Sequence, residues 1–229
     1  LQLGRGETIA DTARVLSRYL DGIMIRTFAH EKAVELARFA TIPVINGLTD
    51  DYHPCQVLAD LLTILEKKGT LHGVKLAYVG DGNNMAHSLM QACTIMGMRI
   101  AVATPPGYEP KAEVQAYSKK VADITGGEVV VTHSPDEAVA DADVVYTDVW
   151  ASMGQEQEAQ QRLRDFRGYQ VDAELMKKAK PDALFMHCLP AHRGEEVSDE
   201  VCDGPQSVIF DQAENRLHAQ KAVLAALLS

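Results

Sequence analysis

The chain has 229 residues, of which 46% are hydrophobic, enough for one large domain or two small ones. Its net charge of −10 argues against general affinity for nucleic acid or anionic membranes, although a few arginines could still bind a small anion. Four cysteines without CxxC spacing argue against a disulfide framework or structural zinc site. The sequence shows no signal peptide and no apolar run of about 18 residues, so we predict a cytoplasmic protein without a membrane span.

The first 65 residues alternate between helical and strand patterns. Helices are expected at 8–20 and 31–40, and strands at 22–26 and 41–47. Such alternation is typical of a parallel α/β sheet. Arg26 ends the first strand, where parallel sheets bind ligands, although a solvated arginine is the plainer interpretation.

The segment His53-Pro54-Cys55-Gln56 predicts the start of a helix. Pro54 suits the first helical position and keeps His53 out of helical geometry. We expect His53 and Gln56 beside the unpaired N–H groups of the helix N-terminus, a ready anion site. Histidine is a poor N-cap compared with Ser or Asp, so we favour a functional role over capping.

A charged, glycine-containing segment at 66–73 predicts a domain boundary, and a second series of strands and helices follows it. We predict a second doubly wound domain. The expected strands are 75–79, 99–104, 128–133, 143–147, 183–186 and 207–210. The expected helices are 85–96, 110–125, 135–140, 156–166, 172–179 and 213–228.

The loop Gly80-Asp81-Gly82-Asn83-Asn84 follows the first strand of this domain, where dinucleotide-binding loops occur. Met85 replaces the third glycine of that fingerprint, and the next strand ends without the ribose-binding acid, so a nicotinamide enzyme is disfavoured. The two asparagines suit an amino-acid headgroup, while a simple tight turn is the alternative.

Asp148 and Ser152-Met153-Gly154 follow the strand at 143–147. An acid, a hydroxyl and a glycine hinge ahead of a polar segment could form a loop that closes over a ligand. An ordinary connection with Ser152 as a helix cap is the alternative, and these residues do not separate the two.

The strand at 183–186 runs into His187-Cys188-Leu189-Pro190. A buried cysteine ending a strand is the plain interpretation. Successive strand residues point to opposite faces, so His187 and Cys188 are not expected to form a base–nucleophile pair. This argues against a cysteine hydrolase.

Taken together, these motifs resemble those of ornithine carbamoyltransferases from the first residue to the last. The matching segments are His53-Pro54-Cys55-Gln56, Asp148 with Ser152-Met153-Gly154, His187-Cys188-Leu189-Pro190 and Glu214-Asn215-Arg216. The first is shared with aspartate carbamoyltransferases, whereas Ser-Met-Gly with His-Cys-Leu-Pro is more specific for the ornithine enzymes. The family's Ser-x-Arg-Thr-Arg phosphate loop is missing, and we expect it upstream of Leu1 in the native protein, because the sequence opens inside a domain.

The resemblance implies two doubly wound α/β domains, the first apparently incomplete at its N-terminus. Residues 1–65 would be the remainder of a carbamoyl-phosphate-binding domain and 66–212 an ornithine-binding domain. The helix at 213–229 would pack back on the first domain. A homotrimer, or a multiple of trimers, is implied as the assembly.

The resemblance also implies substrates and roles. Carbamoyl phosphate would contact Arg26, His53, Gln56, Cys188, Leu189 and Arg216, and ornithine would contact Asn84, Asp148, Ser152 and Met153. Arg26, His53, Cys188 and Arg216 would be the catalytic residues, with Cys188 facing the substrate amine rather than acting as a covalent nucleophile. No metal or organic cofactor is implied, because carbamoyl phosphate is already activated.

Three alternatives stay open. The amine could be putrescine, aspartate or an N-acylornithine, the chain could be a non-catalytic carbamoyltransferase-like subunit, or, last, a dehydrogenase. The sequence also leaves open whether citrulline is made for arginine synthesis or broken down.

Overall fold

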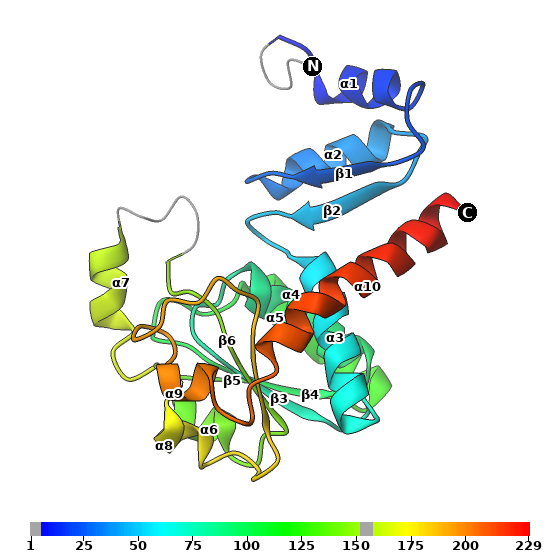
Figure 1. Cartoon of the computed structure of the whole chain (residues 1–229). Helices are drawn as coiled ribbons and strands as arrows, with labels where there is room; N and C mark the ends of the chain where they lie inside the picture. Colours follow the sequence, from blue (N-terminus) through cyan, green and yellow to red (C-terminus); the bar gives the residue numbers. More distant parts are fainter. Residues whose placement is uncertain (1–5, 152–157) are drawn as a thin grey trace.

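The computed structural model describes residues 6–151 and 158–229. It contains two parallel sheets, a two-stranded sheet β1-β2 and a five-stranded sheet in the order β5-β4-β3-β6-β7. Figure 1 shows the small sheet with α1 and α2 at one end of the molecule and the large sheet at the other. The predicted α/β class with parallel sheets is therefore confirmed.

The N-terminal unit consists of α1 (Ile9–Leu16), β1 (Ile23–Arg26), α2 (His30–Phe39) and β2 (Val44–Leu48). The helix α1 ends earlier than predicted, because the chain after Leu16 tightens into a turn in which the Arg18 and Tyr19 N–H groups donate to the Val15 and Leu16 carbonyls. The Ser17 hydroxyl donates to the Ala13 carbonyl and accepts the Thr41 N–H. These bonds tie the end of α1 to the chain just before β2.

The long helix α3 (Pro54–Lys68) connects the two sheets. It begins as predicted, with Pro54 in its first turn and His53 in non-helical geometry. It ends at Gly69, whose φ of +74° is the left-handed conformation that favours glycine. Val57 and Ile64 of α3 pack in the same core cluster as Leu76 of the large sheet.

The large sheet is doubly wound. Its strands are β3 (Lys75–Val79), β4 (Arg99–Ala103), β5 (Glu128–Thr132), β6 (Val144–Thr147) and β7 (Leu184–His187). The helices around it are α4 (Asn84–Ile95), α5 (Ala112–Thr125), α6 (Pro135–Val139), α7 (Ala159–Asp165), α8 (Ala173–Met176) and α9 (Asp199–Cys202). Alternate strand residues enter two separate apolar clusters, for example Ala77 and Val79 in one and Leu76 and Tyr78 in the other.

The predicted strand at 207–210 is wrong. Ser207 makes only an isolated bridge to Phe185, and α10 (Ile209–Leu228) begins two residues later. The prediction was wrong because Val208, Ile209 and Phe210 form a short continuous apolar run, which fits a buried strand as well as a first helical turn. The short helix α9 was not predicted.

The final helix α10 runs along α3 toward the small sheet (Figure 1). Asn215 of α10 donates to the Thr63 hydroxyl and to the Glu66 carboxylate of α3. Near the other end of α10, the Leu228 side chain lies against the backbone of Gly22, where an added Cβ would come within 2.9 Å of it. The helix therefore links both sheets. In the part of the chain that is described, no helix is both long and apolar enough to span a membrane.

Replacing Ile64 with alanine tests the packing of α3 on the large sheet. Ile64 is fully buried, so Ile64→Ala should lower the free energy of unfolding by about 3 kcal/mol in urea titration. Ile124→Ala is the control, because Ile124 is 78% exposed. A loss at Ile64 no larger than at Ile124 would contradict this packing.

Candidate active site

The large sheet reverses its winding direction between β3 and β6. The chain adds β4 and β5 on one side of β3 and then places β6 and β7 on the other. In open parallel sheets, ligands bind beyond the carboxyl ends of the strands at such a switch point. The loops after β3, β6 and β7 carry most of the predicted site residues of this domain.

The loop after β3 is held tightly. At Gly82 an added Cβ would lie 2.3 Å from the Pro110 nitrogen, so only glycine fits. Asn83 caps α4 by accepting the Met85 and Ala86 N–H groups. Its Nδ2 donates to the Asp148 carboxylate at 2.8 Å, which joins the loops after β3 and β6.

Cys188 follows β7 and faces Asp148. Its thiol donates to Asp148 Oδ1 over 3.0 Å. Burial, together with the Asp148 charge and this hydrogen bond, raises the pKa of Cys188 well above its ordinary value. The thiol is therefore protonated and suited to hydrogen bonding rather than to nucleophilic attack.

His187 has different partners, as strand alternation predicts. It is almost fully buried, and its Nε2 lies 3.1 Å from Glu196 Oε1. Its Nδ1 accepts the Leu189 N–H at 2.9 Å, so the remaining proton lies on Nε2 and is donated to Glu196. Leu189 has a φ of +59°, and the bond to His187 holds this left-handed turn just after Cys188.

His53 occupies the N-cap of α3 without capping it. Its backbone N–H donates to Ser88 on α4, and its Nδ1 is buried without a hydrogen-bond partner among the described residues. Burial lowers the His53 pKa to about 4; the charge of Asp148 opposes this shift, and the charges of Arg26 and Arg216 contribute to it. The imidazole is therefore neutral near pH 7.

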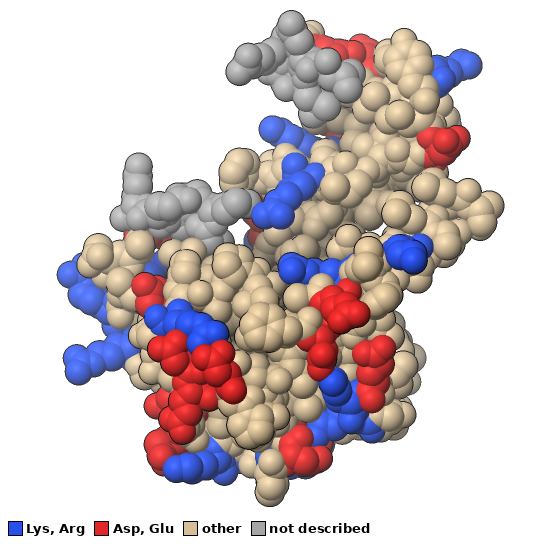
Figure 2. Space-filling view, viewed as in Figure 1, with Lys and Arg blue, Asp and Glu red and all other residues tan. Residues whose placement is uncertain are grey.

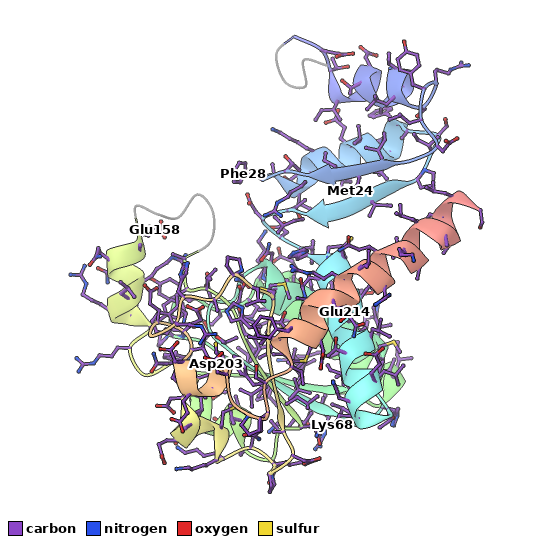
Figure 3. The ribbon with its side chains drawn as sticks, in the orientation of Figure 1. Met24, Phe28, Lys68, Glu158, Asp203 and Glu214 are labelled. Atoms are coloured by element: carbon purple, nitrogen blue, oxygen red, sulfur yellow. The ribbon has the colours of Figure 1, made fainter. Side chains whose placement is uncertain are left out.

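The two arginines come from opposite ends of the chain. Arg26 ends β1 and Arg216 lies on α10, yet both influence the titration of His53. Arg216 Nη1 donates to the Cys188 carbonyl at 3.4 Å. Figure 2 shows Lys and Arg side chains at the hollow between the upper and lower parts of the molecule. Phe28, beyond β1, and Glu158, before α7, lie on opposite sides of it (Figure 3).

Two further predicted residues lie nearby but bond within the protein. Gln56 is buried on α3, and its Nε2 donates to Asp60 Oδ1. Asn84 Nδ2 donates to the Thr49 carbonyl, which ties α4 to the end of β2. Ser152 and Met153 lie outside the described residues. Thus the structure brings Arg26, His53, Asp148, Cys188 and Arg216 to one region, with Gln56 beside it.

A cavity of about 500 Å³ adjoins this region. Leu189 and Arg216 form part of its lining, and Arg193, Cys202 and Phe210 form another part. Leu189 and Arg216 are thus the predicted site residues that face open space here.

A metal ion would find three candidate ligand atoms within 4.8 Å of one another, on Asp148, His187 and Cys188. Both ring nitrogens of His187 already have hydrogen-bond partners, and the Cys188 proton is shared with Asp148. The arrangement therefore fits a hydrogen-bonded site better than a metal centre. That the reaction needs no metal or organic cofactor stays a prediction.

Comparison with known proteins identifies the family of the chain. Residues 1–66 match the family described as aspartate/ornithine carbamoyltransferase, carbamoyl-P binding domain, and residues 72–227 match its Asp/Orn binding domain. The chain belongs to the aspartate/ornithine carbamoyltransferase family. The resemblance found in the motifs is thereby confirmed.

Several relatives of this carbamoyltransferase are close. An ornithine carbamoyltransferase of Anoxybacillus flavithermus is 67% identical over 228 residues, which cover 100% of this chain and 73% of the relative. One from Symbiobacterium thermophilum is 65% identical, with 74% of it covered. The solved ornithine carbamoyltransferase of Pyrococcus furiosus superposes with a TM-score of 0.96 at 63% identity, over 100% of this chain and 73% of that one.

Sequence reasoning missed two buried residues next to this carbamoyltransferase site. Asp60 accepts hydrogen bonds from Gln56 and from Gln212 of α10. Its position one helical turn after Gln56 was the available signal, because residues four apart share a helix face.

Acidification should destabilise the protein through His53. The pKa of His53 is about 4 when folded and 6.5 otherwise, so the unfolded chain binds the proton first as the pH falls. Stability is lost from about pH 6.5 down to about pH 4. His53→Asn should reduce the loss between about pH 7 and pH 5 by up to about 2 kcal/mol in urea titrations. His218→Asn, on the exposed side of α10, is the control. Equal pH dependence in wild type and His53→Asn would contradict the buried neutral imidazole.

Cys188 should resist alkylation. Because its thiol is buried and protonated, iodoacetamide at about pH 8 should modify it at least ~100-fold more slowly than in urea-unfolded protein. Peptide mass spectrometry measures the rate at this position. Fast modification in the folded protein would show a reactive thiolate.

Proposed function

We propose that the protein transfers the carbamoyl group of carbamoyl phosphate to the side-chain amine of L-ornithine, giving L-citrulline and phosphate. One observation supports this most strongly: the two arginines and the neutral His53 come together beside an Asp148–Cys188 pair. The first group suits a phosphorylated substrate and the second suits an amino acid. The relatives named ornithine carbamoyltransferase at 63–67% identity support the same activity.

The arginines are suited to the phosphate. A guanidinium presents a planar set of donors that matches phosphate oxygens. Arg26 and Arg216 approach from two different elements, so a substrate bound by both would draw the small sheet and α10 together. His53, on a helix N-terminus, adds a neutral donor beside them.

Transition-state stabilisation follows from the same groups. Attack of the amine on the carbamoyl carbon builds negative charge on the carbonyl oxygen. Arg26 and His53 are the candidates to stabilise it, at about 3 kcal/mol for each well-placed donor. A neutral imidazole can donate this hydrogen bond and needs no proton from solvent.

The amine must lose its proton before it attacks, since its unperturbed pKa is about 10.4. In our proposal Asp148 binds the α-ammonium group, Asn84, Ser152 and Met153 complete the ornithine site, and Cys188 faces the side-chain amine. The leaving phosphate accepts the proton. The reaction then needs no metal or organic cofactor.

The wider assignment belongs to the same proposal. Residues 1–65 would serve carbamoyl phosphate, residues 66–212 ornithine, and 213–229 would join the two. We propose a homotrimer or a multiple of it as the assembly and the cytoplasm as the compartment. The relative named ornithine carbamoyltransferase, anabolic, from Pyrococcus furiosus supports the direction of arginine synthesis.

An amine panel tests the function. Full-length protein supplied with carbamoyl phosphate should form ureido product from ornithine and at least ~100-fold less from putrescine, aspartate or N-acetylornithine. The reason is that the proposed site binds the free amino-acid headgroup of ornithine through polar side chains such as Asp148.

Replacing Arg216 tests the phosphate site. Arg216→Ala should lower kcat/KM for ornithine carbamoylation by roughly 100-fold, because it removes a guanidinium from the phosphate. Arg38→Ala, on the exposed face of α2, is the control.

Preference for another amine would reject the substrate assignment. If the wild-type protein forms no ureido product from any amine, the enzyme assignment fails in favour of a non-catalytic subunit.

A further inference from the structure

A fully buried carboxylate lies behind the site without a role in the reaction described above. Asp60 is on α3, one turn after Gln56, and its exposed fraction is 0%. Three donors from three elements converge on it. Gln56 Nε2 lies 2.8 Å and Gln212 Nε2 2.7 Å from Oδ1, and the Tyr146 hydroxyl of β6 lies 3.2 Å from Oδ2.

These contacts fix the direction of the Gln56 amide. An ionised carboxylate can only accept hydrogen bonds, so the NH₂ end of Gln56 must face Asp60. The carbonyl end, Oε1, then faces away from Asp60. It is buried and has no hydrogen-bond partner among the described residues. A buried acceptor without a partner is costly unless a ligand supplies the donor.

The same carboxylate sets a second amide. Gln212 turns its NH₂ end to Asp60, so its Oε1 is free to accept the backbone N–H of His187 at 2.9 Å. His187 ends β7 directly before Cys188. Asp60 therefore connects the predicted carbamoyl-phosphate residue Gln56 with the strand end that carries the thiol.

Asp60 is not the only polar link between the two helices. Asn215 already joins α10 to α3 through Thr63 and Glu66. Burial also makes ionised Asp60 unfavourable and raises its pKa to about 7, while the three hydrogen bonds and the charge of Arg216 oppose this. The other titratable groups that interact with it are Tyr146 on β6, Cys93 on α4 and Cys188 after β7. A neutral amide here would accept from both glutamines without the cost of a buried charge.

We propose that Asp60 is a positioning residue for carbamoyl transfer: its carboxylate holds Gln56 with Oε1 turned toward the NH₂ group of carbamoyl phosphate. The inference rests on the proposed function. In this position Gln56 favours carbamoyl phosphate over acetyl phosphate. The NH₂ group of carbamoyl phosphate donates to Oε1, whereas the methyl group of acetyl phosphate cannot.

The test is Asp60→Asn in the full-length protein. Asparagine has the same shape and can keep Oδ1 toward both glutamines, but it replaces charge-assisted hydrogen bonds with weaker neutral ones. KM for carbamoyl phosphate should rise about fivefold, with KM for ornithine unchanged. The melting temperature at about pH 8 should stay or rise, because an ionised buried group has been removed.

Two further variants separate positioning from general loosening. In a Gln56→Ala background, Asp60→Asn should raise KM no further, because the contact is already lost. Thr63→Val removes a hydrogen bond from the same helix interface, so it should lower the melting temperature and leave both KM values unchanged.

Two results would overturn the inference in an active wild type: an unchanged KM in Asp60→Asn, or an equal rise in both backgrounds. A wild-type protein that forms no citrulline would instead overturn the proposed function, and the inference with it.

Discussion

The structure depends on the contact between α10 and α3. Gln212 reaches Asp60 across 152 positions of sequence, and Asn215 reaches Thr63 over the same separation. Both contacts are buried hydrogen bonds, whose loss would leave polar groups without partners and cost stability. They fix the rotation of α10, and this rotation sets Arg216 beside the Cys188 carbonyl. Without this return of the chain, the large sheet would carry only part of the site.

Burial keeps His53 and Cys188 neutral and leaves the positive charge of the site to the arginines. Desolvation lowers the pKa of His53 and raises that of Cys188, so both are hydrogen-bond donors near pH 7 rather than ions. A phosphorylated substrate then meets the positive charge of the two arginines, and no thiolate at Cys188 repels it. The binding of this substrate would therefore change little with pH, except near pH 7, where Asp60 titrates.

Much of this arrangement was predictable from local sequence. The strands β3 to β7 and the start of α3 at Pro54 follow from apolar runs and turn residues, and the strand ends pointed to Arg26, Asp148 and Cys188. The spacing of Gln56 and Asp60 places them on one face of α3, but their link to Gln212 was not predictable, because it forms only when α10 folds back. The wrong strand at 207–210 has the same origin: its apolar residues serve the start of that returning helix.

The central claim is that one site binds both substrates. A crystal structure of the full-length protein with a phosphonoacetyl group joined to the side-chain nitrogen of ornithine, a stable mimic of the joined substrates, tests it most directly. Our account predicts phosphonate oxygens within about 3.2 Å of the Arg26 and Arg216 guanidinium groups. It also places the linking nitrogen beside Cys188 and the α-ammonium group at Asp148. A phosphonate bound out of reach of both arginines, for example in the groove between α8 and α9, would contradict it.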